Sequence, residues 1–280
     1  MAWLRRPIQG VLKAAQRTNS APVPLRSAAS FAVLLPMWRK RRAGRGAGWA
    51  AAFALALGLS GPATAQTAVD LQLVLAVDVS GSVNQVRFEL QKQGYVDAFR
   101  NPRVLQAVLS GRTQSIAVTM VQWSGPFLQV PVLPWTLLKD EASVKSVASL
   151  IEKAPRHLYS GGTSISGVID HAMTLFPQSP FKGERHVIDI SGDGSNNRGR
   201  SVTQARDQAV AAGATINGLP ILAFEPNLDQ YFRDYVIGGP GAFFIAAQSF
   251  ESFADAILKK MILEIATDQR ARSTAHLKRN

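Results

Sequence analysis

The sequence predicts an α/β protein with a doubly wound, mainly parallel sheet that is flanked by helices on both faces. Residues 71–77 and 186–191 are nearly continuous apolar runs, which is typical of parallel strands whose two faces are both covered. Strand-like segments alternate with helix-like segments along most of the chain, and this alternation favours a parallel sheet. Glycine-containing polar loops follow the strands, as expected of connections in such folds.

The first elements can be predicted from apolar patterning and from capping residues. A strand at 71–77 leads into a helix at 83–99, which we expect to begin at Ser82 because Gln85 stands at capping-box spacing. Residues 115–123 are rich in β-branched residues and predict a second strand. Pro131, Pro134 and Trp135 indicate a loop, and residues 141–153 predict a helix.

The remaining elements continue the alternation. Apolar residues recur at helical spacing over 163–176 and over 250–265, and each pattern predicts a helix with one buried face. Between these helices the sequence predicts three strands and one helix. The strands are expected at 186–191, at 214–221 and, as a short last strand, at 242–247, and the helix is expected at 201–212.

The positive charge of the chain is concentrated at its N-terminus. The formal net charge is +12, and residues 1–65 contain ten basic residues and no acidic one. The remainder contains 21 basic and 19 acidic residues, so the predicted folded domain is nearly neutral. A nucleic-acid partner, which requires a basic folded surface, is therefore excluded from our expectations.

Residues 1–65 have the features of a leader with a bacterial signal peptide. A basic cluster at 39–45 precedes an apolar core at 49–59 and the small residues before Gln66, so we expect cleavage after Ala65. The core of about 11 residues is shorter than the roughly 20 that span a bilayer, and we expect no stable membrane anchor after cleavage. A start at Met37 would give a signal of ordinary length, which makes residues 1–36 a mis-assigned start in our interpretation.

The chain contains no cysteine, so it has no lipoprotein attachment site and no disulfide framework. We expect the mature protein in the periplasm or outside the cell. Its predicted organisation is a single α/β domain at 66–267 and a basic, flexible tail at 268–280, where no apolar pattern continues.

Three polar loops occur at the positions where parallel sheets bind ligands. Asp78, Ser80 and Ser82 follow the first strand at alternate positions. A Gly-Gly-Thr-Ser sequence at 161–164 precedes the strongest central helix, and Ser-Gly-Asp-Gly at 191–194 follows the 186–191 strand. Since the carboxyl ends of parallel strands share one edge of the sheet, we expect polar side chains from these loops to lie there together.

This set of motifs resembles the metal-ion-dependent adhesion site (MIDAS) of von Willebrand factor A domains, which have a Rossmann-like fold. The matching positions are Asp78, Ser80, Ser82, Thr163 and Asp193. The resemblance extends over residues 69–266, and the sequences at 123–125 and 217–221 resemble a proteobacterial branch of unknown function. It implies that these five residues hold a divalent cation and that a Glu or Asp of a partner protein completes its coordination.

The chemistry of the five residues is consistent with this implication. Two carboxylates and three hydroxyls form an all-oxygen set, which suits Mg²⁺ first and Mn²⁺ or Ca²⁺ as alternatives. Zinc usually takes nitrogen or sulfur ligands. Five protein groups leave one position of an octahedron vacant, and neutral hydroxyl ligands preserve the ion's attraction for an external carboxylate.

Three enzymatic interpretations and one structural interpretation remain as alternatives. Residues 194–201 resemble a phosphate-binding loop, but they lack its lysine and adjoin Asp193. Residues 162–166 are one glycine short of a nucleophile elbow. A metal-assisted hydrolase would need a general base, and none is evident beside the ligand positions, so we expect a binding protein and not an enzyme. The structural interpretation is a cation that only stabilises the loops.

Asp189 interrupts the apolar run at 186–191. We interpret it as one member of a buried ion pair, with Arg185 or His186 as the expected partner because both are close in sequence.

Overall fold

The structure is a computed structural model that describes the backbone of residues 66–277 and the side chains of residues 66–266. The predicted signal peptide, its cleavage site and the alternative start at Met37 therefore lie outside the described residues or at their border. Among the described helices, none combines the length and apolar character that crossing a membrane would require.

The sheet has five strands in the order β3-β2-β1-β4-β5, with β1 in the centre. Strand β1 pairs in parallel with β2 and β4, β5 pairs in parallel with β4, and β3 runs antiparallel to β2 at one edge. The strands are β1 (Thr67–Asp78), β2 (Ile116–Trp123), β3 (Gln129–Leu138), β4 (Phe181–Gly192) and β5 (Ala214–Pro220). The predicted mainly parallel sheet is thus confirmed.

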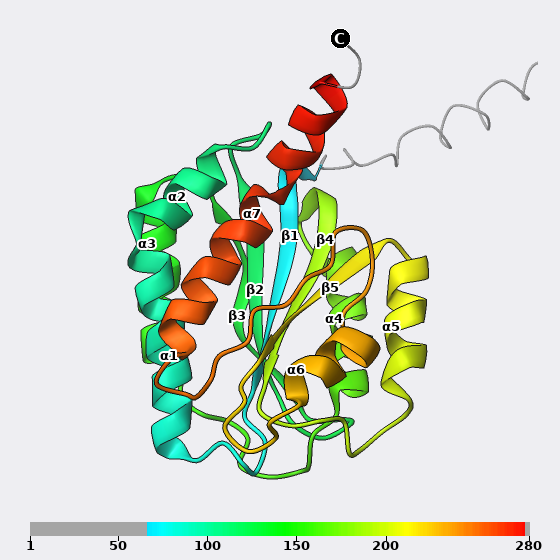
Figure 1. The fold of residues 1–280 in the computed structure, drawn as a ribbon. Helices are drawn as coiled ribbons and strands as arrows, with labels where there is room; N and C mark the ends of the chain where they lie inside the picture. The colour runs from blue at the N-terminus through cyan, green and yellow to red at the C-terminus, as the bar shows by residue number, and fades with distance from the viewer. Residues whose placement is uncertain (1–65, 278–280) are drawn as a thin grey trace, which may run out of the picture. The chain divides into compact units, whose positions relative to one another are not determined.

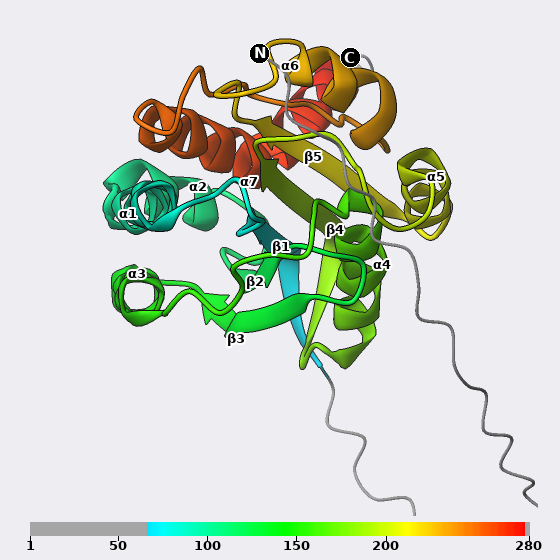
Figure 2. The same cartoon turned by 90° about the horizontal axis from the view of Figure 1, so that it is seen from below.

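Helices cover both faces of the sheet, as Figures 1 and 2 show from two directions. One face carries α1 (Gln85–Arg100), α2 (Pro102–Leu109), α3 (Glu141–Lys153) and α7 (Phe253–Leu277). The other carries α4 (Ile165–Leu175), α5 (Val202–Ala211), α6 (Leu228–Tyr231) and the π-helix Phe232–Val236. A short 3₁₀ turn, Phe176–Gln178, follows α4. The doubly wound arrangement follows from this division.

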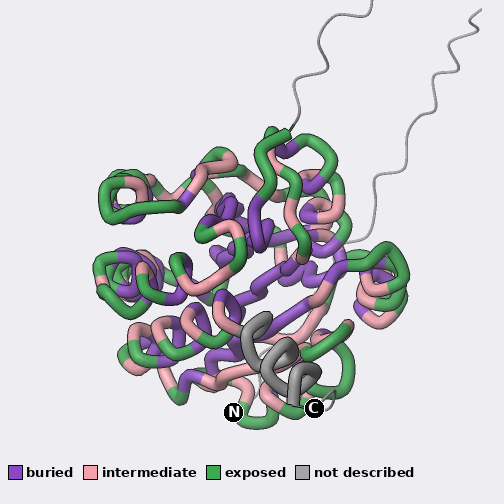
Figure 3. The backbone as a smooth tube through the Cα atoms, turned by 90° about the horizontal axis from the view of Figure 1, so that it is seen from above, coloured by how far each residue is buried: buried purple, intermediate pink, exposed green. Residues whose placement is uncertain are grey.

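The sequence of the central strand β1 is apolar without alternation because both faces of the strand are buried. Leu73 and Leu75 belong to the core cluster under α1 and α7, whereas Val74 and Ala76 belong to the cluster under α4 and α5. Successive side chains of a strand point to opposite faces, so covering both faces buries all four residues completely. Figure 3 shows the buried backbone between outer helices whose residues are mostly exposed or half-buried.

The segment around Pro131 and Pro134 forms β3, so the prediction of a loop there was wrong. Proline lacks a backbone N–H and is excluded from central strands, but an edge strand tolerates it. Helix α1 begins at Gln85, and the side chain of Asn84 caps it by accepting from the backbone N–H of Arg87 at 3.0 Å. Ser82 is therefore not the cap, because its hydroxyl has a different partner.

Several other boundaries differ from those expected. Residues 242–247 form only isolated bridges, Gly218 to Phe244 and Ile221 to Ala247, in place of the predicted strand. Helix α2, helix α6 and the π-helix were not predicted. Helix α7 starts at Phe253 and its backbone continues to Leu277, beyond the predicted end. The flexibility of the tail at 268–280 stays a prediction.

Asp189 is a buried ion-pair member, but the expected partners were wrong. Its Oδ1 lies 2.5 Å from Nζ of Lys260 on α7, and neither side chain is exposed. The same Nζ lies 2.8 Å from Glu264 Oε1, which also accepts from Asn217 Nδ2 at 2.7 Å. Arg185 instead donates to backbone carbonyls of α7. The pairing joins α7 to β4 and depends on helix packing and not on proximity in sequence.

Candidate metal centre

The loop after β1 is held in place by backbone hydrogen bonds to its neighbours. The N–H of Val79 donates to the carbonyl of Trp123 at 2.9 Å, which fastens the loop to the end of β2. The N–H of Ser80 donates to Asp78 Oδ1 at 2.7 Å, and Gln91 Nε2 of α1 donates to the carbonyl of Asp78 at 3.1 Å. Asp78 is consequently fixed and fully buried at the carboxyl end of the central strand.

The second and third polar loops are joined to each other. The N–H of Thr163 donates to Asn197 Oδ1 at 2.9 Å, and the N–H of Asn197 donates to the carbonyl of Thr163 at 2.9 Å. Ser164, the next residue, caps α4 by accepting from the N–H of Gly167. Gly162 has a φ of +80°, which glycine adopts readily and other residues adopt rarely. This turn presents Thr163 at the start of α4.

The five predicted site residues gather at one place on the carboxyl edge. The hydroxyls of Ser80 and Ser82 lie 3.1 Å apart, and the Ser82 hydroxyl donates to Asp193 Oδ1 at 2.7 Å. Ser80, Ser82, Thr163 and Asp193 line one open pocket of about 500 Å³. Asp78 lies beside this pocket, since its carboxylate interacts electrostatically with that of Asp193. Three segments distant in sequence thus bring five oxygen-bearing side chains together.

Burial makes two of these carboxylates unfavourable as anions. It raises the pKa of Asp78 to about 7, and the charge of Asp193 adds to this increase, while the N–H of Ser80 opposes it. Burial likewise raises the pKa of Asp193, against a hydrogen bond from Ser82 and the charge of Arg87. A positive charge between the two carboxylates would reverse these effects.

Two buried oxygens of the site have no hydrogen-bond donor. They are Oδ2 of Asp78 and Oδ2 of Asp193, and buried carboxylate oxygens normally have a partner. No group of three or more His, Cys, Asp or Glu side chains suited to a metal ion occurs in the part of the chain that the structure describes. The donor set therefore combines two carboxylates with hydroxyls, and its unpaired oxygens fit a hard divalent cation.

Two residues of the site were missed by sequence reasoning. Glu225, on the loop after β5, lines the pocket and accepts from the N–H of Ser195 at 2.8 Å through Oε2. Arg87 of α1 donates to the carbonyl of Ser82 at 2.6 Å. The rule that parallel strands share a carboxyl edge could have indicated Glu225, whereas no sequence signal marks Arg87.

The phosphate-loop interpretation finds no support in the geometry of residues 194–201. The N–H of Ser195 donates to Glu225, and the N–H of Asn196 donates to the Tyr231 hydroxyl at 3.3 Å. The N–H groups of Asn197 and Arg198 both donate to the carbonyl of Thr163. A phosphate loop binds its ligand through such backbone N–H groups, and here they already have protein acceptors.

Two solved proteins have a similar fold, each with a TM-score above 0.5. Proximal thread matrix protein 1 from the mussel byssus matches with a TM-score of 0.52 and 16% identity, over 72% of this chain and 49% of that chain. Its form with a zinc-occupied MIDAS motif has a TM-score of 0.50. The pilus adhesin SpaC from Lactobacillus rhamnosus GG matches with a TM-score of 0.53 and 14% identity, over 71% and 31%.

A von Willebrand factor type A protein from Catenulispora acidiphila also matches, with a TM-score of 0.49 and 15% identity over 71% of this chain and 43% of that chain. The chain spans about half the length of the byssus protein and about a third of SpaC. Such low identities show the fold alone. Among curated proteins, none matches this sequence significantly.

A family model matches residues 68–269, which is nearly the whole described domain. The fold is shared with the byssus protein and with SpaC, and its mainly parallel sheet between helices is the architecture that the resemblance of the three polar loops implied. The chain belongs to the family described as "Protein of unknown function (DUF1194)".

Proposed function

We propose that this protein is an exported binding protein that holds one divalent cation and, through it, binds an acidic residue of a partner protein. Asp78, Ser80, Ser82, Thr163 and Asp193 would hold the cation. The observation that carries the proposal is that four of these side chains line one open pocket with Asp78 beside it, and that two buried carboxylate oxygens there lack donors.

The donor set supports Mg²⁺ as the physiological ion, because every donor is an oxygen atom and only two are charged. When bound, the ion supplies a positive charge that attracts an external carboxylate. The zinc-occupied MIDAS motif of the byssus protein supports divalent cation binding by this type of site. The pilus adhesin supports protein recognition as the purpose of the fold, without identifying a partner for this chain.

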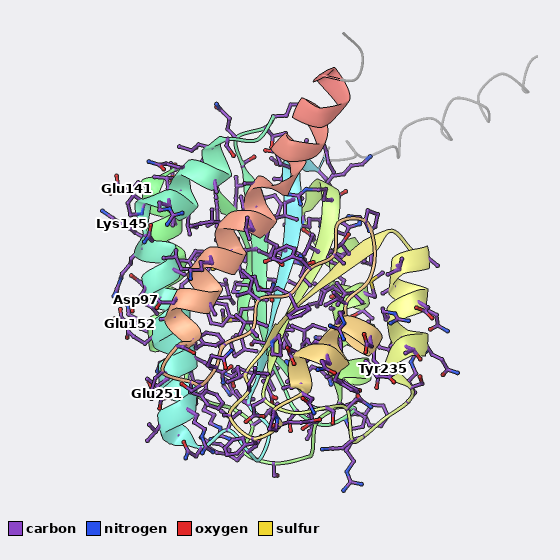
Figure 4. The ribbon with its side chains drawn as sticks, in the orientation of Figure 1. Asp97, Glu141, Lys145, Glu152, Tyr235 and Glu251 are labelled. Carbon is purple, nitrogen blue, oxygen red and sulfur yellow. The ribbon has the colours of Figure 1, made fainter. Side chains whose placement is uncertain are left out.

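Isothermal titration calorimetry with Mg²⁺, Mn²⁺ and Ca²⁺ tests the cation site. We expect one site per chain, and we expect Asp78→Ala and Asp193→Ala each to abolish binding. Asp97→Asn is the matched control, because Asp97 is an exposed carboxylate on the outer surface of α1 (Figure 4). Binding that survives both site substitutions would refute the assignment.

We also propose binding and not catalysis. The backbone N–H groups of residues 195–198 donate within the protein, so they do not offer a cradle for a nucleotide. Retention of a partner on the immobilised protein in Mg²⁺, with release by a chelator, supports a binding protein. Turnover of a phosphate ester by the Mg²⁺-loaded protein that Asp78→Ala abolishes would instead support the hydrolase alternative.

Export is part of the proposal and has its own test. The predicted cleavage site would leave Gln66 as the first residue, directly before β1. N-terminal sequencing of the protein from a periplasmic or culture fraction should therefore begin at Gln66. An intact cellular protein that begins within residues 1–36 would contradict both the cleavage site and the start at Met37.

A further inference from the structure

Exposed apolar side chains gather around the proposed cation site. Among the described residues, the large apolar side chains with the greatest exposure are Phe127 (95%), Val86 (68%), Tyr159 (64%) and Phe224 (53%). Phe127 lies between β2 and β3, Tyr159 between α3 and α4, and Phe224 between β5 and α6. Val86 belongs to the first turn of α1, which follows the 78–82 loop. A cluster of exposed apolar side chains beside a polar pocket is typical of an interaction surface.

One part of this surface forms a groove between α1, the loop after β5 and the segment before α7. Its volume is about 370 Å³. Its apolar lining includes Val86, Leu90, Phe224 and Phe250. Phe224 also lines the pocket of the proposed cation site, so the groove and the pocket are adjacent. Glu251, which Figure 4 labels near α1, is a polar residue of the groove wall.

Arg87 holds the groove and the cation site in a common arrangement. Its guanidinium donates to the carbonyl of Ser82 and lies 4.3 Å from the centre of the Phe224 ring and 5.6 Å from that of Phe250. Arg156 has a similar position beside the pocket, since it donates to the carbonyls of Val79 and Ser80 and lies 4.7 Å from the Tyr159 ring. Cation–π contacts of this kind keep an aromatic ring in place without burying it.

The charges around the pocket favour an acidic ligand once a divalent cation is bound. Three arginines and four carboxylates surround the pocket and the groove: Arg87, Arg156, Arg198, Asp78, Asp193, Glu225 and Glu251. A dication makes their combined charge positive. A single acidic side chain in the pocket would leave Val86 and Phe224 exposed. Charge therefore accounts for the polar pocket but not for the apolar groove beside it.

We propose that the partner presents a short segment in which the acidic residue lies at a fixed spacing from a large apolar side chain, and that this apolar side chain fills the groove. The inference rests on the proposed function and adds the second recognition element. The acidic residue meets the cation pocket, and the apolar residue packs between Val86, Leu90 and Phe224, where it removes their exposed surface from water.

The test uses displayed peptides of random sequence around one fixed central glutamate. They are selected on the purified protein in Mg²⁺ and eluted with a chelator. We expect the eluted peptides to share a large apolar residue at one spacing from the glutamate. Val86→Ser and Phe224→Ser should each weaken binding of a selected peptide by about tenfold, which corresponds to the loss of one buried apolar contact.

Leu109→Ser is the matched control, because Leu109 is an exposed apolar residue (39%) at the end of α2 and lies outside the groove. It should leave peptide affinity unchanged, and Mg²⁺ affinity should be unchanged in Val86→Ser and Leu109→Ser. Chelator-sensitive peptides that bind Val86→Ser and Phe224→Ser as well as the unaltered protein would overturn the groove and leave the proposed function in place. Failure to select any chelator-sensitive peptide would count against both.

Discussion

Replacing Asp78 with asparagine should stabilise the metal-free protein, although Asp78 is a proposed ligand. The substitution removes a buried negative charge that faces Asp193 without changing the size of the side chain. Its Oδ1 can still accept from the N–H of Ser80, and the new Nδ2 replaces an oxygen that has no donor. The folded protein therefore loses a repulsion and keeps the hydrogen bond from the N–H of Ser80.

The magnitude follows from the pKa of Asp78, which burial and Asp193 raise from 3.8 to about 7. The folded protein binds this proton more tightly than the unfolded chain, so stability falls as the pH rises between these two values. At about 1.4 kcal/mol per pH unit, the ionised carboxylate costs about 4 kcal/mol above pH 7 and less than about 2 kcal/mol near pH 5. The advantage of Asp78→Asn should therefore grow by about 3 kcal/mol over this interval.

The assay is urea unfolding of both proteins in a chelator at about pH 5 and about pH 8. In Mg²⁺ at a hundred times its Kd, the unaltered protein should gain about 2.7 kcal/mol, and Asp78→Asn should gain little. Asp189 also titrates near pH 7 because of its burial, but it does so in both proteins and cancels in the comparison. An Asp78→Asn protein that is less stable than the unaltered protein in chelator at the higher pH would refute the reasoning.

Three further substitutions test the surroundings of the site. Lys260→Met should lower the free energy of unfolding in urea by about 3 to 5 kcal/mol, because Asp189 would remain buried without a counter-charge. A decrease of less than about 1 kcal/mol would contradict a stabilising ion pair. Glu225→Gln should weaken Mg²⁺ binding several-fold by calorimetry, since the pocket loses a negative charge; an unchanged Kd would show that Glu225 does not act on the ion. Gly94→Ala should lower the free energy of unfolding by about 1 to 3 kcal/mol in thermal or urea unfolding, because the new Cβ would lie 2.7 Å from the ring of Phe253. An unchanged stability would show that α1 and α7 can move apart at this position.

The sequence by itself determined the elements whose signals are local. Buried runs such as 71–77 indicate strands with two covered faces, and helical spacing indicated α4 and α7. The bounds of α3 were predicted as they occur, because an acidic cap and an apolar face define it. The five proposed ligands were named because three polar loops resemble the motifs of one family. Two of these loops lie at the carboxyl ends of β1 and β4, whereas the loop that contains Thr163 lies between α3 and α4.

Only the tertiary structure decided which groups meet across the fold. It paired Asp189 with Lys260 in place of its neighbours in sequence, brought Glu225 and Arg87 to the pocket, and placed Pro131 in an edge strand. Backbone hydrogen bonding and apolar periodicity operate within one element and leave a pattern in the sequence. Charge pairing across the fold depends on which elements pack side by side, so residues such as Lys260 and Arg87 carry no sequence signal for the groups that they contact.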